Sequence, residues 1–587
     1  MGLKKAVFLF LLFTLVFILL GGTIKHGFNS DDYNVIYHAL HQESVGWREG
    51  LSEFLRPSWG LYYRPGIKVF FELLGRVFHL WSGGYHMMSL ICFAVLCFEV
   101  YVLGLRITGR WLLGLVSAVI FLTSSVHAEA IFWISSINGA VENILTLASL
   151  ICFIRWRQDR STPSYACSLV LFACALLTKE SAISLPIIVF IYDMLLGASN
   201  PVRDGAIAGG NTQVIREHRG HPCQSESPGP TTADVYSRLL NAIMRSATSC
   251  LPFIALGVLF VAVRHVVMRQ VHLPPALTAF DWRILIVGLW YSLIMTLSPI
   301  DWALALNWFD RLAGNGVVFP VVGGVTILAV VVVPLILKRF RATFLLWWIM
   351  VSAAPVLCLG LVPSERHMVL GSSAAAILIS VALFGLSESA APRSRRYSIV
   401  LGCVLAIAFA GTSCYYLKQR QTIWKHASDI AGDVVEQTTQ IYPAPGSGTT
   451  FFFLNVPDSV EGALVFRFDN LKYALRLFYG DESLDAVRIV TVEMIPYGAL
   501  SYGKSAYFKI GALGGHIYFP ERSLQDQVCA ERWRRVKQLG IVGKDSRYQR
   551  DWERYVGSPF LVYEGGEVSP RRPEALKEAL ENLYSLH

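Results

Sequence analysis

The chain has 587 residues and a formal net charge of +9, with 54% hydrophobic and only 16% charged residues. Soluble domains carry about 25% charged residues, so this composition excludes an ordinary soluble enzyme. The positive charges stand in short clusters between apolar runs, which argues against nucleic acid as a partner and is typical of the cytoplasmic loops of membrane proteins. We therefore expect a mainly α-helical, polytopic protein of the cell (inner) membrane.

A bilayer core requires about 20 apolar residues per helix. Eleven runs of this kind occur, at 5–22, 86–105, 111–127, 138–154, 163–178, 181–198, 247–266, 316–337, 342–362, 368–387 and 398–416. The first run follows Lys4 and Lys5 and lacks a small-residue cleavage site, so a membrane anchor fits it better than the alternative, a cleavable signal peptide.

The orientation follows from Lys and Arg in the short loops. If eleven segments span, every basic cluster lies on the side of the N-terminus, which we expect to be cytoplasmic. The apolar run 284–300 would reverse this parity from the Lys338-Arg339 cluster onward if it crossed. We therefore interpret 284–300 as a re-entrant or interfacial helix on the outer side.

This topology divides the chain into a transmembrane domain, 1–417, and an extracytoplasmic domain, 418–587. Within the first, we expect an outer loop at 23–85 and a flexible cytoplasmic loop at 199–245, which is polar and rich in Gly, Pro and Ser. In the outer loop, Tyr62 to Trp81 has apolar residues at helical spacing interrupted by charges, which predicts an amphipathic helix on the outer membrane face.

The tail has the pattern of a small α/β domain. We expect strands at 451–456, 487–492 and 517–519, a helix at 463–479 and a C-terminal helix at 573–586. Cys529 is the one cysteine beyond residue 420 and the sequence contains no C-x-x-C pair, so no disulfide framework supports this domain.

Five sets of charged residues lie at apolar boundaries on the predicted outer side, where ionisable groups are costly and usually functional. In the first, Asp31 and Asp32 follow the first span and suit a general base or, alternatively, a divalent cation. The structural alternative is a cap on a helix that begins at Tyr33. We assign no metal site.

The other four sets each have a functional and a structural interpretation. They are Tyr62-Tyr63-Arg64-Pro65, His127-Ala-Glu129, Thr178-Lys179-Glu180-Ser181 and Ser364-Glu365-Arg366-His367. The arginines and the lysine suit a phosphate, whereas interfacial snorkelling, a satisfied His–Glu pair and a Lys–Glu pair closing a turn are the alternatives. Together the five sets predict one outward-facing site for a lipid-linked anionic substrate.

The succession of these motifs resembles the GT-C superfamily of membrane glycosyltransferases, in particular the protein O-mannosyltransferase-like enzymes and their bacterial relatives. Its most specific part is Thr178-Lys179-Glu180-Ser-Ala-Ile-Ser-Leu-Pro186 followed by Tyr192-Asp193, and the resemblance covers roughly residues 1–430. The motif around His127 and Glu129 and the residues after Arg366 depart from the family pattern, and the C-terminal domain replaces the repeats found in some relatives.

The resemblance implies a polyprenyl-phosphate-linked sugar donor, used on the outer or lumenal face, and an acidic base in the first outer loop. That base would be Asp31 or Asp32, while Arg64, Lys179 and Arg366 would face the donor phosphate, with Tyr63, His127, Glu129, Glu180 and Glu365 as further substrate-binding candidates. We expect a hexosyltransferase that transfers a sugar with inversion to a hydroxyl of a glycan, lipid or protein. A lipid-linked polysaccharide ligase or polymerase, or a transporter, is the alternative.

Overall fold

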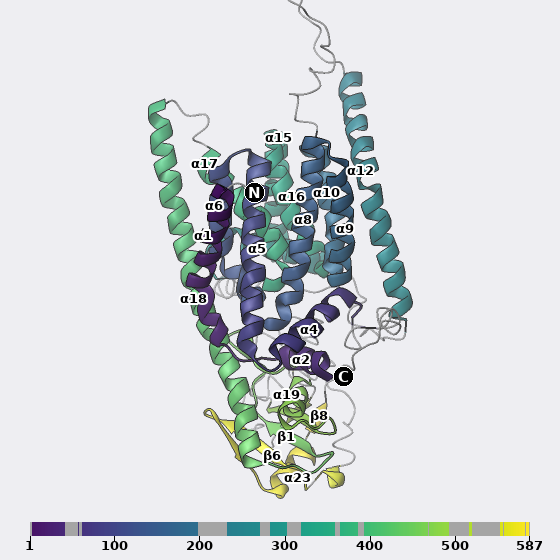
Figure 1. Ribbon diagram of the computed structural model, residues 1–587, viewed down its shortest axis with the longest axis vertical. Helices are drawn as coiled ribbons and strands as arrows, with labels where there is room; N and C mark the ends of the chain where they lie inside the picture. Colours follow the sequence, from purple (N-terminus) through teal and green to yellow (C-terminus); the bar gives the residue numbers. More distant parts are fainter. Residues whose placement is uncertain are drawn as a thin grey trace, which may run out of the picture.

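The protein is described by a computed structural model (Figure 1). The residues that it describes are 3–41, 57, 62–197, 232–269, 282–301, 318–358, 364–385, 392–467, 469–491, 516–518, 534, 552–555, 557–581 and 583–585. A bundle of long helices forms one part, and a small mixed sheet lies at one end of it (Figure 1). We call that end of the bundle the domain end.

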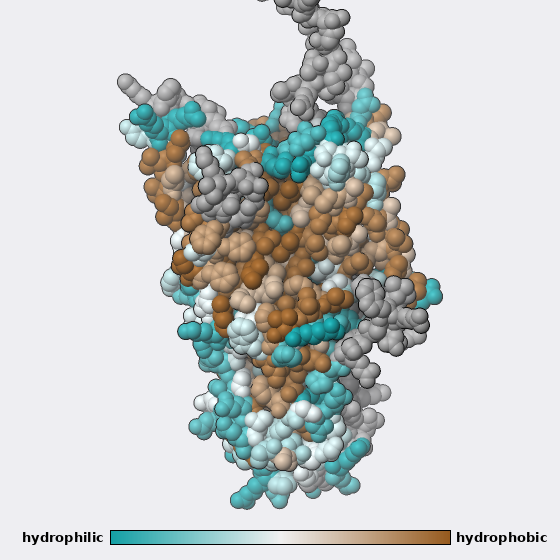
Figure 2. Space-filling model, in the orientation of Figure 1, coloured by the Kyte–Doolittle hydropathy of each residue, from teal (hydrophilic) through white to brown (hydrophobic). Residues whose placement is uncertain are grey.

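Each of the eleven predicted apolar runs overlaps a helix. The bundle comprises α1 (Leu3–Leu20), α5 (Ser82–Thr108), α6 (Trp111–Thr123), α8 (Ile137–Asp159), α9 (Thr162–Thr178), α10 (Leu185–Leu195), α12 (Thr232–Val267), α13 (Trp282–Leu297), α15 (Val318–Ile336), α16 (Phe340–Leu357), α17 (Val369–Gly385) and α18 (Pro392–Ile441). Helices suit these sequences because a spanning segment must satisfy its own backbone hydrogen bonds. Apolar side chains cover the bundle and polar ones gather toward its two ends (Figure 2).

Five of the described helices are individually long and apolar enough to cross a membrane, and a sixth span results if α6 and the following segment to Phe132 are one helix bent by 58°. The five lie at Ser82–Thr108, Ile134–Asp159, Leu240–Val267, Phe340–Leu357 and Ser394–Ile441. Other predicted spans are shorter apolar helices. The chain is therefore a multi-pass membrane protein with five to six clear candidate spans, and the predicted number of eleven stays a prediction.

Helix α13 covers the run 284–300 and lies toward the domain end. Tyr291 and Met295 pack with Val126 and Met368, and Asp301, just beyond the helix, lies 3.9 Å from the guanidinium of Arg420. The re-entrant or interfacial interpretation of this segment stays a prediction.

Two short helices of the predicted outer loop lie between the bundle and the sheet (Figure 1). They are α2 (Asp31–His41) and α4 (Pro65–Phe78). The predicted amphipathic helix is confirmed as α4, which buries Ile67 and Phe71 and exposes Leu73 and Val77. Much of the stretch between α2 and α4 lies outside the described residues, as does 199–231 of the predicted cytoplasmic loop. From Thr232 onward the prediction of a loop is wrong, because these residues belong to helix α12.

The C-terminal domain is built on a six-stranded sheet in the order β7-β6-β1-β4-β5-β8. Its strands are β1 (Thr450–Leu454), β4 (Asp485–Thr491), β5 (His516–Tyr518), β6 (Phe560–Glu564), β7 (Glu567–Pro570) and β8 (Leu583–Ser585). Strands β6, β1, β4 and β5 run parallel, and the two edge strands are antiparallel to their neighbours. A two-stranded hairpin, β2 (Ser459–Val460) with β3 (Ala463–Leu464), precedes helix α19 (Asn470–Tyr479).

Alternation along β1 explains the layers, because successive side chains point to opposite faces of a sheet. Phe451 and Phe453 pack in the core that also contains residues of α18 and α19, whereas Phe452 packs with α23 (Pro573–Glu581). Two helical predictions are wrong in extent. Residues 463–464 are extended because they pair with β2, and the last helix ends at Glu581 because 583–585 pair with β5.

Helix α18 joins the two parts. It passes through the predicted domain boundary at 417/418 without a break and continues to Ile441 along the sheet domain (Figure 1). Beyond the boundary it buries Trp424, Ala427 and Ala431 in the same core as the bundle. A continuous helix therefore places the C-terminal domain against the domain end of the bundle.

Candidate functional site

The predicted site residues come from short segments between the bundle and the C-terminal domain. Besides α2, these segments include η2 (Ser125–His127), α7 (Ala128–Phe132), η4 (Glu180–Ser184) and η6 (Glu365–His367). A further short segment, η3 (Ile134–Ser136), contacts α2 and α7. Each follows or precedes an apolar helix, so charged side chains collect where the helices end. The site is consequently assembled from parts of the chain that are far apart in sequence.

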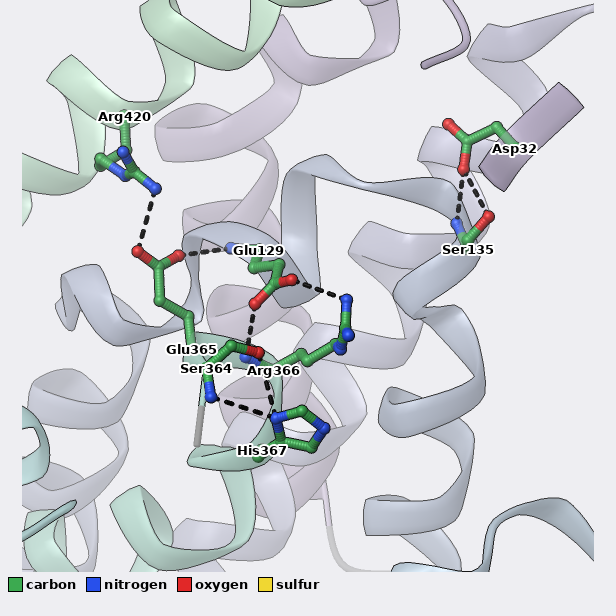
Figure 3. A network of polar contacts seen from close by, with 8 residues as sticks. All are labelled: Asp32, Glu129, Ser135, Ser364, Glu365, Arg366, His367 and Arg420. Atoms are coloured by element: carbon green, nitrogen blue, oxygen red, sulfur yellow. Dashed lines mark hydrogen bonds and ion pairs between the residues drawn. The ribbon is translucent and has the colours of Figure 1, made fainter. Parts of the chain in front are cut away.

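Asp32 is fully buried and its carboxylate accepts three hydrogen bonds. Oδ1 accepts from the backbone N–H and the hydroxyl of Ser135, each at 2.7 Å (Figure 3). Oδ2 accepts from the Asn29 N–H at 3.1 Å. Burial raises the pKa of Asp32 to about 7, although these hydrogen bonds lower it. The carboxylate thus ties α2 to η3, which is a structural role.

Asp31 has a different environment on the same helix turn, because α2 begins here and not at Tyr33. Its side chain is half-buried, and Oδ1 accepts a 2.6 Å hydrogen bond from the amide of Asn470 in the C-terminal domain. Burial raises the pKa of Asp31, while Asn470 and the charges of Arg366 and Arg467 lower it. Of the two predicted acids, Asp31 is the one that faces the cations.

Arg64 and Glu180 form a bidentate ion pair. The Nε and Nη2 atoms of Arg64 donate to the two carboxylate oxygens at 2.8 and 2.6 Å. Arg64 lies 4.2 Å from the ring centroid of Tyr62, whereas Tyr63 is buried against Phe260. Tyr62, not the predicted Tyr63, is the ring beside the cation, and Glu180 does not close its turn with the neighbouring lysine.

Lys179 is a buried cation, with 6% of its surface exposed. Among the described residues no ion pair or side-chain hydrogen bond is made by its ammonium group. The ammonium lies against Gly139, where an added Cβ would come within 3.3 Å of Nζ. Burial, then the charges of Arg64 and Arg366, lower the pKa of Lys179 to about 8, and buried Glu142 acts in the opposite direction.

Glu129 and Arg366 are joined by reciprocal contacts between α7 and η6 (Figure 3). Arg366 donates to Glu129 through its guanidinium at 2.8 Å and through its backbone N–H at 3.1 Å, and Glu365 accepts the Glu129 N–H at 2.9 Å. The guanidinium of Arg366 also lies 4.9 Å from the ring of Trp133. These bonds fix the direction of Arg366.

Arg420 on α18 holds the same cluster from the side of the long helix. It donates to Glu365 Oε1 at 3.0 Å (Figure 3). It also donates to the backbone carbonyl of Glu461 at 2.7 Å. Both Arg420 and Glu365 are almost fully buried. Glu365 is therefore an anchor between η6, α7 and α18, and its predicted contact with substrate lacks support.

The histidines His127 and His367 both bond to neighbouring serines of the protein. His127 is fully buried and contacts the rings of Phe93 and Phe121, and its Nε2 is 2.7 Å from the Ser372 hydroxyl. His367 Nδ1 accepts the Ser364 N–H at 3.1 Å. Burial and the charges of Arg366, Lys179 and Arg64 hold the pKa of His367 well below its usual value, which fits this acceptor role.

The donor set does not fit the divalent cation considered beside Asp31 and Asp32. Both Asp32 oxygens already accept N–H or O–H donors, and Asp31 faces Arg366 and Arg467. Over the part of the chain that the structure describes, no group of three or more His, Cys, Asp or Glu side chains is arranged to hold a metal ion.

Lys179 and Arg366 both lie beside Gly139, where an added Cβ would come within 3.3 Å of Lys179 Nζ and 3.9 Å of the Arg366 carbonyl oxygen, and Arg64 is paired with Glu180, the residue after Lys179. That these three residues bind one phosphate stays a prediction. Sequence reasoning missed Glu142, Arg420, Arg467 and Asn470. Glu142 carried a usable signal, since it is an acid inside an apolar run. Arg467 and Asn470 carried no such signal, because nothing in their local sequence marks them as neighbours of Asp31.

Comparisons with known proteins give matches in structure alone: no family model matches the chain, and no curated protein matches it. The chain is similar to the archaeal oligosaccharyltransferase AglB from Archaeoglobus fulgidus, in complex with an inhibitory peptide and a dolichol-phosphate, at 11% identity and a TM-score of 0.41 over 97% of this chain and 75% of that one. It is also similar to ArnT from Cupriavidus metallidurans bound to undecaprenyl phosphate, at 10% identity and a TM-score of 0.39 over 90% of this chain and 95% of that one. Both similarities extend over most of the chain, at low identity and with TM-scores below 0.5.

Proposed function

We propose that the protein is a membrane glycosyltransferase that moves a sugar from a polyprenyl-phosphate carrier to an acceptor hydroxyl, with inversion, at the domain end of the bundle. Asp31 acts as the base, and Lys179, Arg64 and Arg366 bind the donor phosphate. The acceptor is a glycan, lipid or protein. We place this site on the extracytoplasmic side because the Lys and Arg residues of the loops cluster on the opposite side.

The observation that carries the proposal is the buried ammonium of Lys179. A buried ion without a partner is costly in free energy, and such a group persists where function requires it. The charges of Arg64 and Arg366 disfavour the protonated form of Lys179, whereas Glu142 and Glu180 favour it. An anionic ligand at this place would relieve the cost, and a lipid phosphate reaches it from the membrane while its tail stays in hydrocarbon.

The arrangement of charges gives the site a direction. Arg366 acts electrostatically on both Asp31 and Lys179. Asp31 is bonded to Asn470 of the C-terminal domain, whereas Lys179 directly follows α9. An anomeric carbon held between them would present one face to an acceptor hydroxyl beside Asp31 and the opposite face to its phosphate, as inversion requires.

The proposed transfer conserves atoms and charge with these residues and the two substrates alone. The acceptor oxygen forms a bond to the anomeric carbon while the bond from that carbon to the phosphate oxygen breaks. The hydroxyl proton passes to Asp31, and the electron pair of the broken bond leaves with the polyprenyl phosphate. Preorganised cations stabilise that developing charge, which is a major source of catalysis in enclosed sites.

The proposal is tested on Lys179→Met in nanodiscs, with Lys425→Met as the control because Lys425 is exposed and paired with Asp429. We expect Lys179→Met to weaken binding of undecaprenyl phosphate by about tenfold or more, the effect of losing about 1.4 kcal/mol. Lys425→Met should bind normally. Unaltered binding by Lys179→Met contradicts the assignment.

A second measurement needs no activity. Because the pKa of Lys179 falls from 10.5 to about 8 on folding, unfolding takes up a proton between these values. The wild type should therefore gain stability relative to Lys179→Met as the pH rises from about 8 to 10. Undecaprenyl phosphate should reduce this difference, because a bound anion favours the charged lysine. A difference that is independent of pH contradicts the buried cation.

A further inference from the structure

The segment before and at the start of α19 is in direct contact with the first turn of α2. The Ser30 N–H donates to the Val465 carbonyl at 2.7 Å, and the ring of Tyr33 stacks on Phe466 with centroids 5.6 Å apart. Tyr33, Val465 and Phe466 belong to one core that includes the bundle. The C-terminal domain thus contacts the base-bearing helix itself.

Asn470 makes the contact closest to the chemistry. Its amide nitrogen donates to Asp31 Oδ1 at 2.6 Å and lies 3.3 Å from the Ser30 hydroxyl. The side chain of Asn470 is 2% exposed, so packing holds the amide in this direction. Asn470 therefore occupies Oδ1 of Asp31, and Oδ2 is the other oxygen of the carboxylate.

The charges around Asp31 explain why such a bond matters. Arg366 on η6 and Arg467 of the C-terminal domain both face the carboxylate, and Asp32 follows it on its own helix. Glu129 is bonded to Arg366 and also acts on Arg467. A carboxylate that turned into a close ion pair with either arginine would be a weaker base, because nearby positive charge stabilises its deprotonated form.

We propose that Asn470 is a positioning residue for Asp31, so that the C-terminal domain completes the catalytic site. This inference rests on the proposed function, in which Asp31 is the base. The amide holds Oδ1 and directs Oδ2 toward the acceptor hydroxyl. Because the amide is presented by α19, the orientation of the base depends on docking of the whole domain.

The test compares Asn470→Ala and the nearly isosteric Asn470→Asp with Lys472→Ala, a change on the same helix at a residue that bonds to Asp469. We expect both Asn470 variants to lower kcat by about 10- to 100-fold with undecaprenyl-phosphate affinity unchanged. Losing a hydrogen bond that favours the carboxylate raises the pKa of Asp31, so the acidic limb of the pH–rate profile should move to higher pH. Lys472→Ala should behave as the wild type.

A normal kcat, or an acidic limb that stays in place or moves to lower pH, overturns the inference. Amide hydrogen exchange at residues 30–33 gives a readout that is independent of activity, and it should accelerate in Asn470→Ala but not in Lys472→Ala. If the wild type transfers no sugar, the proposed function fails, and unaltered exchange would then overturn the positioning role as well. If the wild type is active and Asp31→Asn is inactive, normal Asn470 variants remove the positioning role alone.

Discussion

At the scale of single residues, Asp31 and Asp32 show how neighbouring identical side chains acquire different roles. Asp32 points inward to three donors from Ser135 and Asn29, whereas Asp31 points to Asn470 and two arginines. Successive residues of a helix are separated by about 100°, so one of them is buried by the η3 segment and the other meets the C-terminal domain.

This difference predicts separable effects of two conservative substitutions. Asp31→Asn should lower turnover by about 10²–10⁴-fold, the usual effect of losing a general base, with little change in stability. Asp32→Asn should lower stability by about 1–3 kcal/mol, because an amide NH₂ would face an N–H donor. Turnover assays and an unfolding titration in detergent measure both. Equal effects of the two variants on both measurements would contradict the division of roles.

At the scale of elements, short segments between helices hold the cations in place. Segment η6 is bonded to α7 through Glu129 and Glu365, and to α18 through Arg420. Segment η4 is bonded through Glu180 to Arg64, at the start of α4. Each arginine considered as a phosphate ligand therefore has a glutamate that orients it, and Lys179 remains the cation that an anion would complete.

The anchor at Glu365 should dominate stability among the acids of this region. Removing one member of a buried ion pair typically costs about 3–5 kcal/mol, so Glu365→Gln should unfold at a markedly lower denaturant concentration. The matched control is Asp429→Asn, which breaks an exposed pair on α18 and should change stability by about 0.5 kcal/mol or less. An equal, small effect of both substitutions in the unfolding titration would show that the η6 junction is not an anchor.

At the scale of the whole molecule, α18 connects the apolar bundle to a domain with a parallel sheet core, and both share one buried core. The predicted site lies between these two parts, where α2, η6 and the start of α19 meet. A membrane protein with this organisation presents its soluble domain and its site on the same side of the bilayer.

The side is tested by single-cysteine labelling on a background without the eleven native cysteines. Lys425→Cys, exposed beyond residue 417, should react with an impermeant reagent in intact cells, whereas Asp159→Cys, exposed at the opposite end of α8, should react only after lysis. Labelling of Asp159→Cys from outside would reverse the predicted orientation.

By itself the sequence indicated the apolar helices of the bundle, three strands of the sheet and the charged boundaries, because apolar periodicity and charge placement act locally. It predicted α4, the strands at Phe451 and Val487, and a cluster of Arg64, Lys179 and Arg366. Tertiary structure alone decided which acid faces the cations, which cation has no ion pair among the described residues, and that Asn470 meets Asp31. The last two residues are 439 positions apart, and no local pattern encodes such a contact, since it depends on how α18 carries the C-terminal domain back onto α2.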